Sequence, residues 1–330
     1  MNSRGEFDFL ARLRDRARRR PDASLSLGIG DDAAVFVPRS GCETLISTDL
    51  LVEDVDFRLS WISPFQLGHK ALAVSLSDLA AMGARPRYAL VALGLSARLW
   101  PTNFKEQFYR GFFALADSYQ VKLIGGDLSR TPGKAVVDSI VLGEVRRGRS
   151  VRRSGARPGD LIFVTGSLGG AAGGLCLLRK NKKAVRSTAQ KALIKRQLLP
   201  SPRIEWGLLL GEKRLASAMI DLSDGLSSDL THLCCESGVG ARIEAENLPL
   251  DSSLTAAAQS DDEALTLALD GGEDYELLFT VDPRRAGKLP RELHGVPLTR
   301  IGEITEKTAG LKIRRANRWV RLRIGGFRHF

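Results

Sequence analysis

Residues 63–84 read SPFQLGHKALAVSLSDLAAMGA, and this stretch predicts one long and mostly apolar helix over Pro64–Met82. Ser63 can cap the first turn, and Gln66 stands at the spacing of a capping box. Gly83 can end the helix because glycine readily adopts the left-handed conformation found there. A helix that is apolar on most sides is a buried one, so we expect it to lie in the core of a domain.

Strands and helices alternate on both sides of this helix. The segment Arg146–Gly159 is rich in Arg, Ser, Gly and Pro, and it marks a candidate boundary between a domain of residues 1–148 and one of residues 149–330. We expect an α/β and α+β protein with two lobes. The predicted strands are Ala33–Val37, Thr44–Thr48, Tyr88–Leu95, Val121–Ile124, Val136–Val145, Leu161–Thr165, Met219–Leu222, Tyr275–Val281 and Leu298–Ile304, and the other predicted helices include Asn103–Tyr119 and Leu226–Glu236.

Carboxylates recur at unusual places along the chain. The shared pattern is an apolar strand, a glycine turn and then an acidic residue, and Asp78 adds a carboxylate within the apolar helix. Because the ends of strands are rigid, we expect these side chains to converge in one cleft. The residues are Asp31, Asp32, Asp49, Asp78, Asp127, Asp221, Asp224, Glu273 and Asp274.

Converging carboxylates repel one another unless cations neutralise them. Oxygen ligands without histidine or cysteine favour Mg²⁺ over zinc, and bound Mg²⁺ usually also contacts phosphate oxygens. The four cysteines contain no Cys-x-x-Cys pair, and we interpret them as reduced thiols. The residues alone therefore predict a magnesium site that handles a phosphate ligand.

Two glycine motifs have other interpretations. Gly28-x-Gly30-x-x-Ala33 fits a dinucleotide fingerprint, but acidic residues fill its variable positions and a strand rather than a helix is predicted after it. No Walker A motif or protein-kinase catalytic loop is present. The run Gly166–Gly170 opens a helix after a strand, so it is either an anion site or a tight packing turn.

The formal net charge of +11 raises the possibility of a nucleic-acid binder. Six arginines crowd residues 12–20, but apolar residues recur there at helical spacing, which favours an amphipathic helix with a solvated basic face. No zinc finger or RNA-recognition motif is present, and no apolar run suits a membrane span or a signal peptide. We expect a cytoplasmic protein that binds neither nucleic acid nor membrane.

The acidic motifs belong to an ordered set that resembles the thiamine-monophosphate kinase family along nearly the whole chain. The longest blocks are Lys70–Ala84 and Gly271–Leu277, and both are highly specific. The wider superfamily, with aminoimidazole ribonucleotide synthetase and selenophosphate synthetase, shares the fold and the use of ATP. The other blocks are Gly28–Ala33, Ser47–Asp49, Gly125–Asp127, Arg153–Ala156 and Asp221–Leu226.

The resemblance implies an N-terminal ATP- and metal-binding domain that forms a homodimer through its sheet, and a C-terminal domain that completes each site. It also implies several Mg²⁺ ions, ATP as co-substrate and thiamine monophosphate as acceptor. By similarity the metal ligands are Asp32, Ser47, Thr48, Asp49, Asp78, Asp127, Asp221 and Asp224; the ATP contacts are Tyr109, Gly126, Asp127, Arg153 and Ser223; and the substrate contact is Glu273.

Two positions depart from the family pattern. Asp56-Phe57 stands where the family often has His-Phe, and Ile324-Gly325-Gly326-Phe327 replaces a Trp-x-Gly-aromatic motif. Both positions are associated with the acceptor. We therefore add Asp56 and Phe327 to the candidate substrate contacts, since the Phe327 ring can stack on an aromatic ligand.

The implied reaction moves the γ-phosphoryl group of ATP onto thiamine monophosphate, giving thiamine diphosphate and ADP. No general base is needed, because the second pKa of a phosphate monoester is about 6 and the acceptor oxygen is already ionised. We expect no catalytic residue beyond the metal ligands. The alternatives are another ATP-dependent enzyme of the superfamily and, more remotely, a basic nucleic-acid-binding protein.

Overall fold

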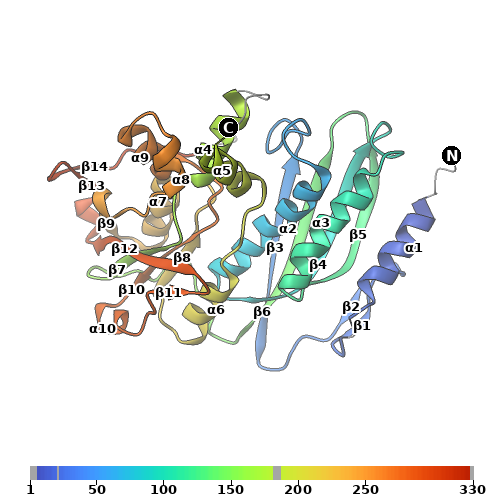
Figure 1. The fold of residues 1–330 in the computed structure, drawn as a ribbon. Coiled ribbons are helices and arrows are strands. Elements are labelled where there is room, and N and C mark those ends of the chain that lie inside the picture. The colour runs from blue at the N-terminus through green and yellow to red at the C-terminus, as the bar shows by residue number, and fades with distance from the viewer. Residues whose placement is uncertain (1–5, 21, 181–186, 328–330) are drawn as a thin grey trace. The chain divides into compact units, whose positions relative to one another are not determined.

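The computed structural model describes residues 6–20, 22–180 and 187–327. It divides into two compact units. Unit 1 holds the residues up to Leu79 together with Arg85–Gly148, and unit 2 holds Ala80–Ala84 together with the residues from Arg149 onward. Both units mix helices with sheets (Figure 1), which confirms the predicted α/β and α+β class.

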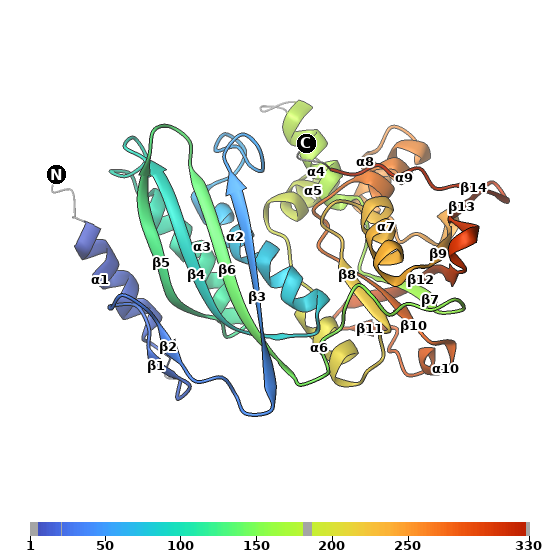
Figure 2. The ribbon, with the colours of Figure 1, turned by 180° about the vertical axis from the view of Figure 1, so that it is seen from behind.

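Unit 1 is built on a four-stranded sheet in the order β3-β6-β4-β5. Only the β4–β5 pair is parallel. Helices α2 and α3 cover one face of this sheet (Figure 1), and the other face is seen in Figure 2. The elements are α1 (Glu6–Ala17), β1 (Leu25–Leu27), β2 (Val35–Phe36), β3 (Cys42–Val52), α2 (Pro64–Ala81), β4 (Arg85–Ser96), α3 (Phe104–Ser118), β5 (Lys122–Thr131) and β6 (Val136–Arg146).

Helix α2 follows the prediction closely. The capping box is present: Ser63 Oγ accepts from the Gln66 backbone N–H at 3.3 Å, and the Ser63 N–H donates to Gln66 Oε1 at 2.9 Å. Gly83 follows the helix with a φ of +70°. A Cβ on Gly68 would lie 1.9 Å from the Phe108 carbonyl oxygen, so α2 crosses α3 at a distance that only glycine permits.

Strands β3 and β5 are longer than predicted, and this changes the position of two aspartates. Asp49 lies within β3 rather than after its end, and Asp127 lies within β5, so the glycine turn predicted before Asp127 is wrong. Gly126 has a φ of +148°, and a Cβ there would meet the Val91 carbonyl oxygen at 2.0 Å. Because Gly126 has no side chain, β5 can approach β4 closely there, next to an irregularity in the β4–β5 pairing. Strand β5 continues through Gly126.

The strand predicted at Ala33–Val37 is also shorter than expected. Only Val35 and Phe36 are in β2, which pairs with the short strand β1. Val35 and Val37 are exposed, so little packing holds a longer strand in place. The basic segment forms the predicted helix α1, and Arg16 and Arg20 pair with Asp117 at its surface.

Unit 2 contains an eight-stranded sheet in the order β14-β13-β9-β12-β7-β10-β8, with β11 paired to β12. A continuous apolar core includes Ile220, Leu230 and Leu278. The elements are β7 (Leu161–Thr165), α4 (Gly170–Lys180), α5 (Thr188–Leu198), α6 (Ile204–Glu212), β8 (Ala218–Asp221), α7 (Leu226–Ser237), β9 (Gly240–Glu244), η1 (Ala245–Asn247), α8 (Ser252–Ala257), α9 (Asp261–Asp270), β10 (Leu277–Val281), α10 (Pro283–Ala286), β11 (Glu292–Leu293), β12 (Val296–Thr305), η2 (Lys307–Ala309), β13 (Leu311–Arg315) and β14 (Arg318–Arg321).

The four cysteines are free thiols, as expected. Among the described residues, no helix is both long enough and apolar enough to cross a membrane.

Candidate active site

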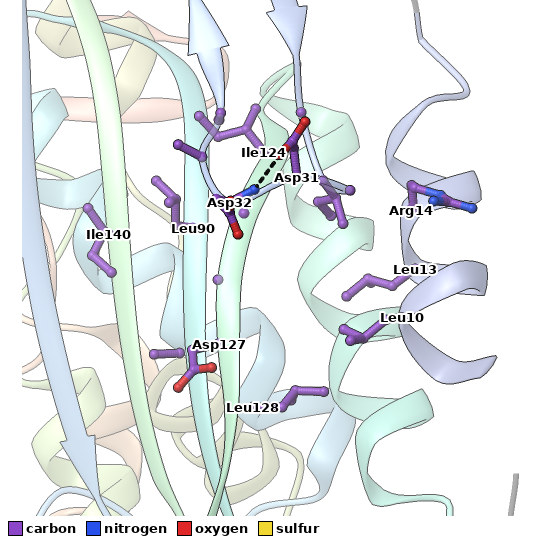
Figure 3. Close-up of a pocket in the computed structure, with 18 of the residues that line it drawn as sticks. Leu10, Leu13, Arg14, Asp31, Asp32, Leu90, Ile124, Asp127, Leu128 and Ile140 are labelled. Carbon is purple, nitrogen blue, oxygen red and sulfur yellow. Dashed lines mark hydrogen bonds between the residues drawn. The ribbon is translucent and has the colours of Figure 1, made fainter. Parts of the chain in front are cut away.

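A cavity of about 840 Å³ lies in unit 1 between the sheet and helix α1. It brings together Asp32, Tyr109, Gly126 and Asp127 of the predicted metal and ATP positions. Figure 3 shows Asp31 and Asp32 in the turn after the Gly28–Gly30 segment, with Asp127 further along the sheet and α1 on the other side. The cavity therefore combines carboxylates with an apolar wall, which suits a ligand that has both a charged part and a ring.

Tyr109 supplies part of this wall from helix α3. Its side chain is buried, and its ring centroid lies 5.6 Å from that of Phe9 and 5.3 Å from that of Phe108. Burial raises the pKa of its hydroxyl well above the ordinary value, so Tyr109 stays protonated and can donate a hydrogen bond. The aromatic neighbours fix the ring at the cavity edge.

A second group of carboxylates lies on the helix-covered face of the sheet. The Ser47 hydroxyl donates to Asp78 of α2, and Asp49 lies close enough to Asp78 for the two charges to interact. Asp49 Oδ2 is buried and has no hydrogen-bond partner among the described residues. Burial and, next, the Asp78 charge raise the pKa of Asp49 to about 6. Asp49 therefore has an open, buried oxygen close to a second carboxylate.

Asp138 is a carboxylate that the sequence analysis missed. It lies in β6 opposite Leu50 of β3 and Ala92 of β4, and Ala92 in turn lies opposite Asp127. The Thr48 hydroxyl donates to Asp138 Oδ1 at 2.6 Å. The available signal was a carboxylate inside the strand predicted at Val136–Val145, which also contains Ser139 and Glu144.

The carboxylates of unit 1 therefore occupy both faces of one sheet. Directly opposed residues share a face. Asp127 and Asp138 share the face that lines the cavity, whereas Asp49 lies opposite the buried Ser139 on the α2 face. Convergence in a single cleft is thus wrong for these residues of unit 1. In the described part of the chain, no three acidic, histidine or cysteine side chains form a preassembled metal cluster.

Unit 2 brings together several of its own predicted residues. The Glu273 N–H donates to the Ser223 carbonyl at 2.8 Å, and the Phe327 N–H donates to the Asp224 carbonyl at 3.2 Å. The Ser227 hydroxyl accepts from the Gly325 N–H at 3.1 Å. The loop after β8, the glycine-rich loop before β10 and the C-terminal segment therefore lie side by side.

The glycine-rich loop has a strained backbone. Glu273 and Tyr275 have φ values of +70° and +51°, which non-glycine residues rarely adopt. The half-buried carboxylate of Glu273 accepts a hydrogen bond from Gln197. Strain of this kind persists where surrounding contacts fix the backbone and is concentrated at functional sites.

The run Gly166–Gly170 is a packing turn that contains its own anion. The buried Asp274 carboxylate accepts from the Gly169 N–H and from the Ala171 N–H at 3.1 Å, at the N-terminus of α4. A Cβ on Gly166 would lie 2.1 Å from Glu276 Oε1. The alternative of an external anion at this turn is therefore wrong, because a protein carboxylate fills the position.

Three further residues lie as follows. Burial and, next, the Asp224 charge raise the pKa of Asp229 to about 7, and the charge of the exposed Arg153 lowers it. Asp229, which the sequence analysis missed, accepts from the Gly225 N–H at 3.0 Å and so holds the loop that carries Asp224.

Asp56 Oδ2 accepts from the Val52 N–H at 2.8 Å, so the Asp56 carboxylate stabilises its own turn.

Comparison with known proteins matches both parts of the chain to one family. Residues 30–145 match the family model "AIR synthase related protein, N-terminal domain", and residues 157–313 match "AIR synthase related protein, C-terminal domain". These matches agree with the ATP-using superfamily that the motifs resemble.

Similarity to individual proteins extends over the full length. The chain is 43% identical to thiamine-monophosphate kinase of Salmonella typhimurium, over 99% of this chain and 98% of that protein. It resembles the crystal structure of thiamine-monophosphate kinase from Stenotrophomonas maltophilia K279a with a TM-score of 0.83 and 39% identity, covering 94% of this chain and 96% of that one. A structure described as AaThiL complexed with AMPPCP and TMP gives a TM-score of 0.78 and 33% identity, covering 99% and 97%. The chain therefore belongs to the thiamine-monophosphate kinase family, within the AIR synthase related proteins.

Proposed function

We propose that this protein transfers the γ-phosphoryl group of ATP to thiamine monophosphate, giving thiamine diphosphate and ADP. An oxygen of the acceptor phosphate forms the new bond to the γ-phosphorus. The bond from that phosphorus to the bridging oxygen breaks, and its electron pair leaves with ADP. The cytoplasm, where ATP is abundant, is the proposed compartment.

The observation that carries this proposal is full-length similarity to thiamine-monophosphate kinases, including a relative described with the ATP analogue AMPPCP and with TMP. The cavity of unit 1 fits the donor, since it combines Tyr109 and an apolar wall with Asp32 and Asp127. An acidic cavity suits a polyphosphate only in the presence of cations.

The residues present fit Mg²⁺ at two places in unit 1, at the cavity with Asp32 and Asp127 and on the α2 face of the sheet with Asp49 and Asp78. The donors are oxygens only, and Asp49 Oδ2 is buried beside Asp78 without a hydrogen-bond partner among the described residues. We propose as ligands Asp32, Ser47, Thr48, Asp49, Asp78 and Asp127 in unit 1, and Asp221 and Asp224 in unit 2. Bound Mg²⁺ neutralises charge that develops on the transferring phosphoryl group.

The chain's own residues then bind and orient the two substrates. Tyr109 and Gly126 are the proposed ATP contacts in unit 1, with Arg153 and Ser223 in unit 2. Glu273 and Phe327 are the proposed acceptor contacts, because a carboxylate and an aromatic ring suit a cationic aromatic ligand. The acceptor phosphate is already ionised near neutral pH, so no side chain has to remove a proton.

We also propose a homodimer formed through the sheet of unit 1. Strand β3 is at one end of the strand order, and among the described strands it pairs with β6 alone. Its outward-facing Ile46 and Leu50 are 68% and 58% exposed. A long edge strand with exposed apolar residues is usually covered by another chain. Light scattering at micromolar concentration should give twice the mass of the chain, and a monomer mass would refute the dimer.

The test of the activity is a substrate panel with ATP and Mg²⁺, followed by chromatography of ADP and thiamine diphosphate. Thiamine monophosphate should be converted, and unphosphorylated thiamine should not, because its hydroxyl would need a base to be deprotonated. Chelator should reduce the rate to background. If thiamine is the better acceptor, or if ATP is used only with another metabolite, the proposed function is wrong.

A further inference from the structure

Arg14 of helix α1 differs in its contacts from Arg12, Arg16 and Arg20 of the same segment. Arg12 pairs with Glu106 at 3.7 Å, whereas Arg16 and Arg20 pair with Asp117. Arg14 forms no salt bridge with the described residues, and its Nε is buried without a hydrogen-bond partner there. Since the guanidinium lines the cavity and has no counter-charge among the described residues, an anionic ligand in the cavity would be favoured.

The position of Arg14 is fixed by the turn that precedes the first acidic pair. A Cβ built on Gly30 would lie 3.2 Å from Arg14 Cδ and 3.5 Å from one of its terminal nitrogens. The side chain therefore packs on Gly30, two residues before Asp32. Figure 3 places Arg14 on the α1 side of the cavity, one turn of helix from Leu10.

The chemistry of the cavity identifies the group that Arg14 can bind. Its other charged lining residues are Asp31, Asp32 and Asp127, all exposed. A phosphate chain that reaches Asp32 through a cation also comes within reach of Arg14, whose planar guanidinium matches phosphate oxygens. The apolar wall formed by Leu10, Leu13 and Leu128 then remains for the uncharged part of the same ligand.

We propose that Arg14 is a phosphate-binding residue of the nucleotide site, which holds the phosphate chain of a nucleoside triphosphate from the side of α1. This inference rests on the proposed use of ATP, but it does not depend on the identity of the acceptor. Arg14 touches the donor substrate and adds a positive charge to a cavity that otherwise has only negative ones.

The competing interpretation is an internal one, in which Arg14 only reduces repulsion between Asp31 and Asp32. In the structure neither carboxylate is within salt-bridge distance of Arg14, and Asp31 Oδ1 instead accepts from the Asp32 N–H at 2.9 Å. If the role is internal, the Arg14→Gln variant should be less stable, and any loss of nucleotide affinity should not depend on the number of phosphates in the ligand. The two interpretations therefore differ in a measurable way.

The experiment is calorimetric binding of ATP, ADP and AMP in the presence of Mg²⁺ and without acceptor, to the full chain and its variants. Arg14→Gln should weaken ATP binding about tenfold, ADP binding less and AMP binding least, because the lost contacts are to phosphate. Arg14→Lys keeps the charge and should restore part of the ATP affinity. Arg12→Gln, on the same helix, is the matched control and should bind all three nucleotides normally.

Equal weakening for ATP, ADP and AMP would overturn the proposal, because it would indicate a displaced helix rather than a lost phosphate contact. Unchanged ATP affinity in Arg14→Gln would overturn it as well. The Lys variant keeps the comparison valid if the Gln variant folds poorly. Conversion of an acceptor other than thiamine monophosphate would refute the proposed function and leave this nucleotide series unaffected.

Discussion

Asp49 in unit 1 and Asp274 in unit 2 are both aspartates whose pKa is raised by burial, to about 6 and about 7. Their partners differ. Asp274 accepts from two backbone N–H groups at the start of α4 and is close to the Arg196 charge. At Asp49 the largest charge effect on the pKa comes from Asp78, a like charge, and one buried oxygen has no hydrogen-bond partner among the described residues.

Asp274 is a carboxylate that stabilises the fold through its own hydrogen bonds, whereas Asp49 has an oxygen that is available to a ligand. A buried charge that the protein neutralises itself contributes to folding or specificity, and removing its partner is costly. A buried carboxylate without such neutralisation needs an external cation when it is ionised. The comparison therefore predicts that substitutions in the two regions affect different properties, stability in unit 2 and ligand binding in unit 1.

The largest expected effect is on the stability of unit 2, where buried carboxylates have partners within the protein. Glu276 is fully buried, and its carboxylate is bound by Arg203 and by Arg196 at 3.3 Å. Glu276→Gln removes a buried counter-charge from both guanidinium groups, although Arg196 keeps its pair with Asp251 at 3.3 Å, so it should lower the free energy of unfolding by about 3 kcal/mol or more. Urea denaturation measures this, with the exposed Glu292→Gln as a near-neutral control. A loss below about 1 kcal/mol would contradict the structural role.

The next largest effect is expected on turnover, from the unit 1 carboxylates that are proposed as metal ligands. Asp49→Asn and Asp127→Asn each remove a proposed metal ligand at nearly constant size, so each should lower the rate of thiamine diphosphate formation at least about tenfold. Circular dichroism should show an intact fold for both, since neither carboxylate holds an arginine or a helix terminus. Near-normal turnover in both variants would remove the basis for a metal role.

A smaller effect is expected at Glu273, which combines features of both regions. Its carboxylate is bound by Gln197, yet it lies on a strained loop beside Ser223. Glu273→Gln should raise the KM for thiamine monophosphate up to about fivefold and leave the KM for ATP unchanged, as expected for one partly solvated ion pair. Equal changes in both KM values would indicate that Glu273 only holds the loop.

Much of the fold was predictable from local signals. Helix α2 has its capping box, its apolar length and its terminal glycine in one segment, and its predicted range ends one residue beyond the observed one. Strands β7 and β6 were also close to their predicted bounds, because runs of apolar residues between turn residues specify them. The acidic motifs also identified residues that line the cavity of unit 1. They could be recognised because carboxylates seldom stand among apolar residues in a sequence.

Long-range pairing could not be predicted in the same way. Gly126 resembles a turn residue in the sequence, but its role is to let β5 approach Val91 of β4. Which face of the sheet Asp49 occupies depends on its register with Ser139, and a shift of one residue would reverse it. Likewise, only the fold places Asp274 at the N-terminus of α4, where it fills the predicted anion position.

Equilibrium titration of Mg²⁺ onto the metal-free protein shows whether the open oxygen of Asp49 marks a magnesium site. The unsubstituted protein should bind Mg²⁺, and Asp49→Asn should bind at least one ion about tenfold more weakly, because a charged oxygen ligand is lost. Asp262→Asn is the control, since the Asp262 side chain is 88% exposed and pairs with Arg315 on the surface of unit 2. Equal Mg²⁺ affinity and stoichiometry in the unsubstituted protein and in Asp49→Asn would contradict the claim.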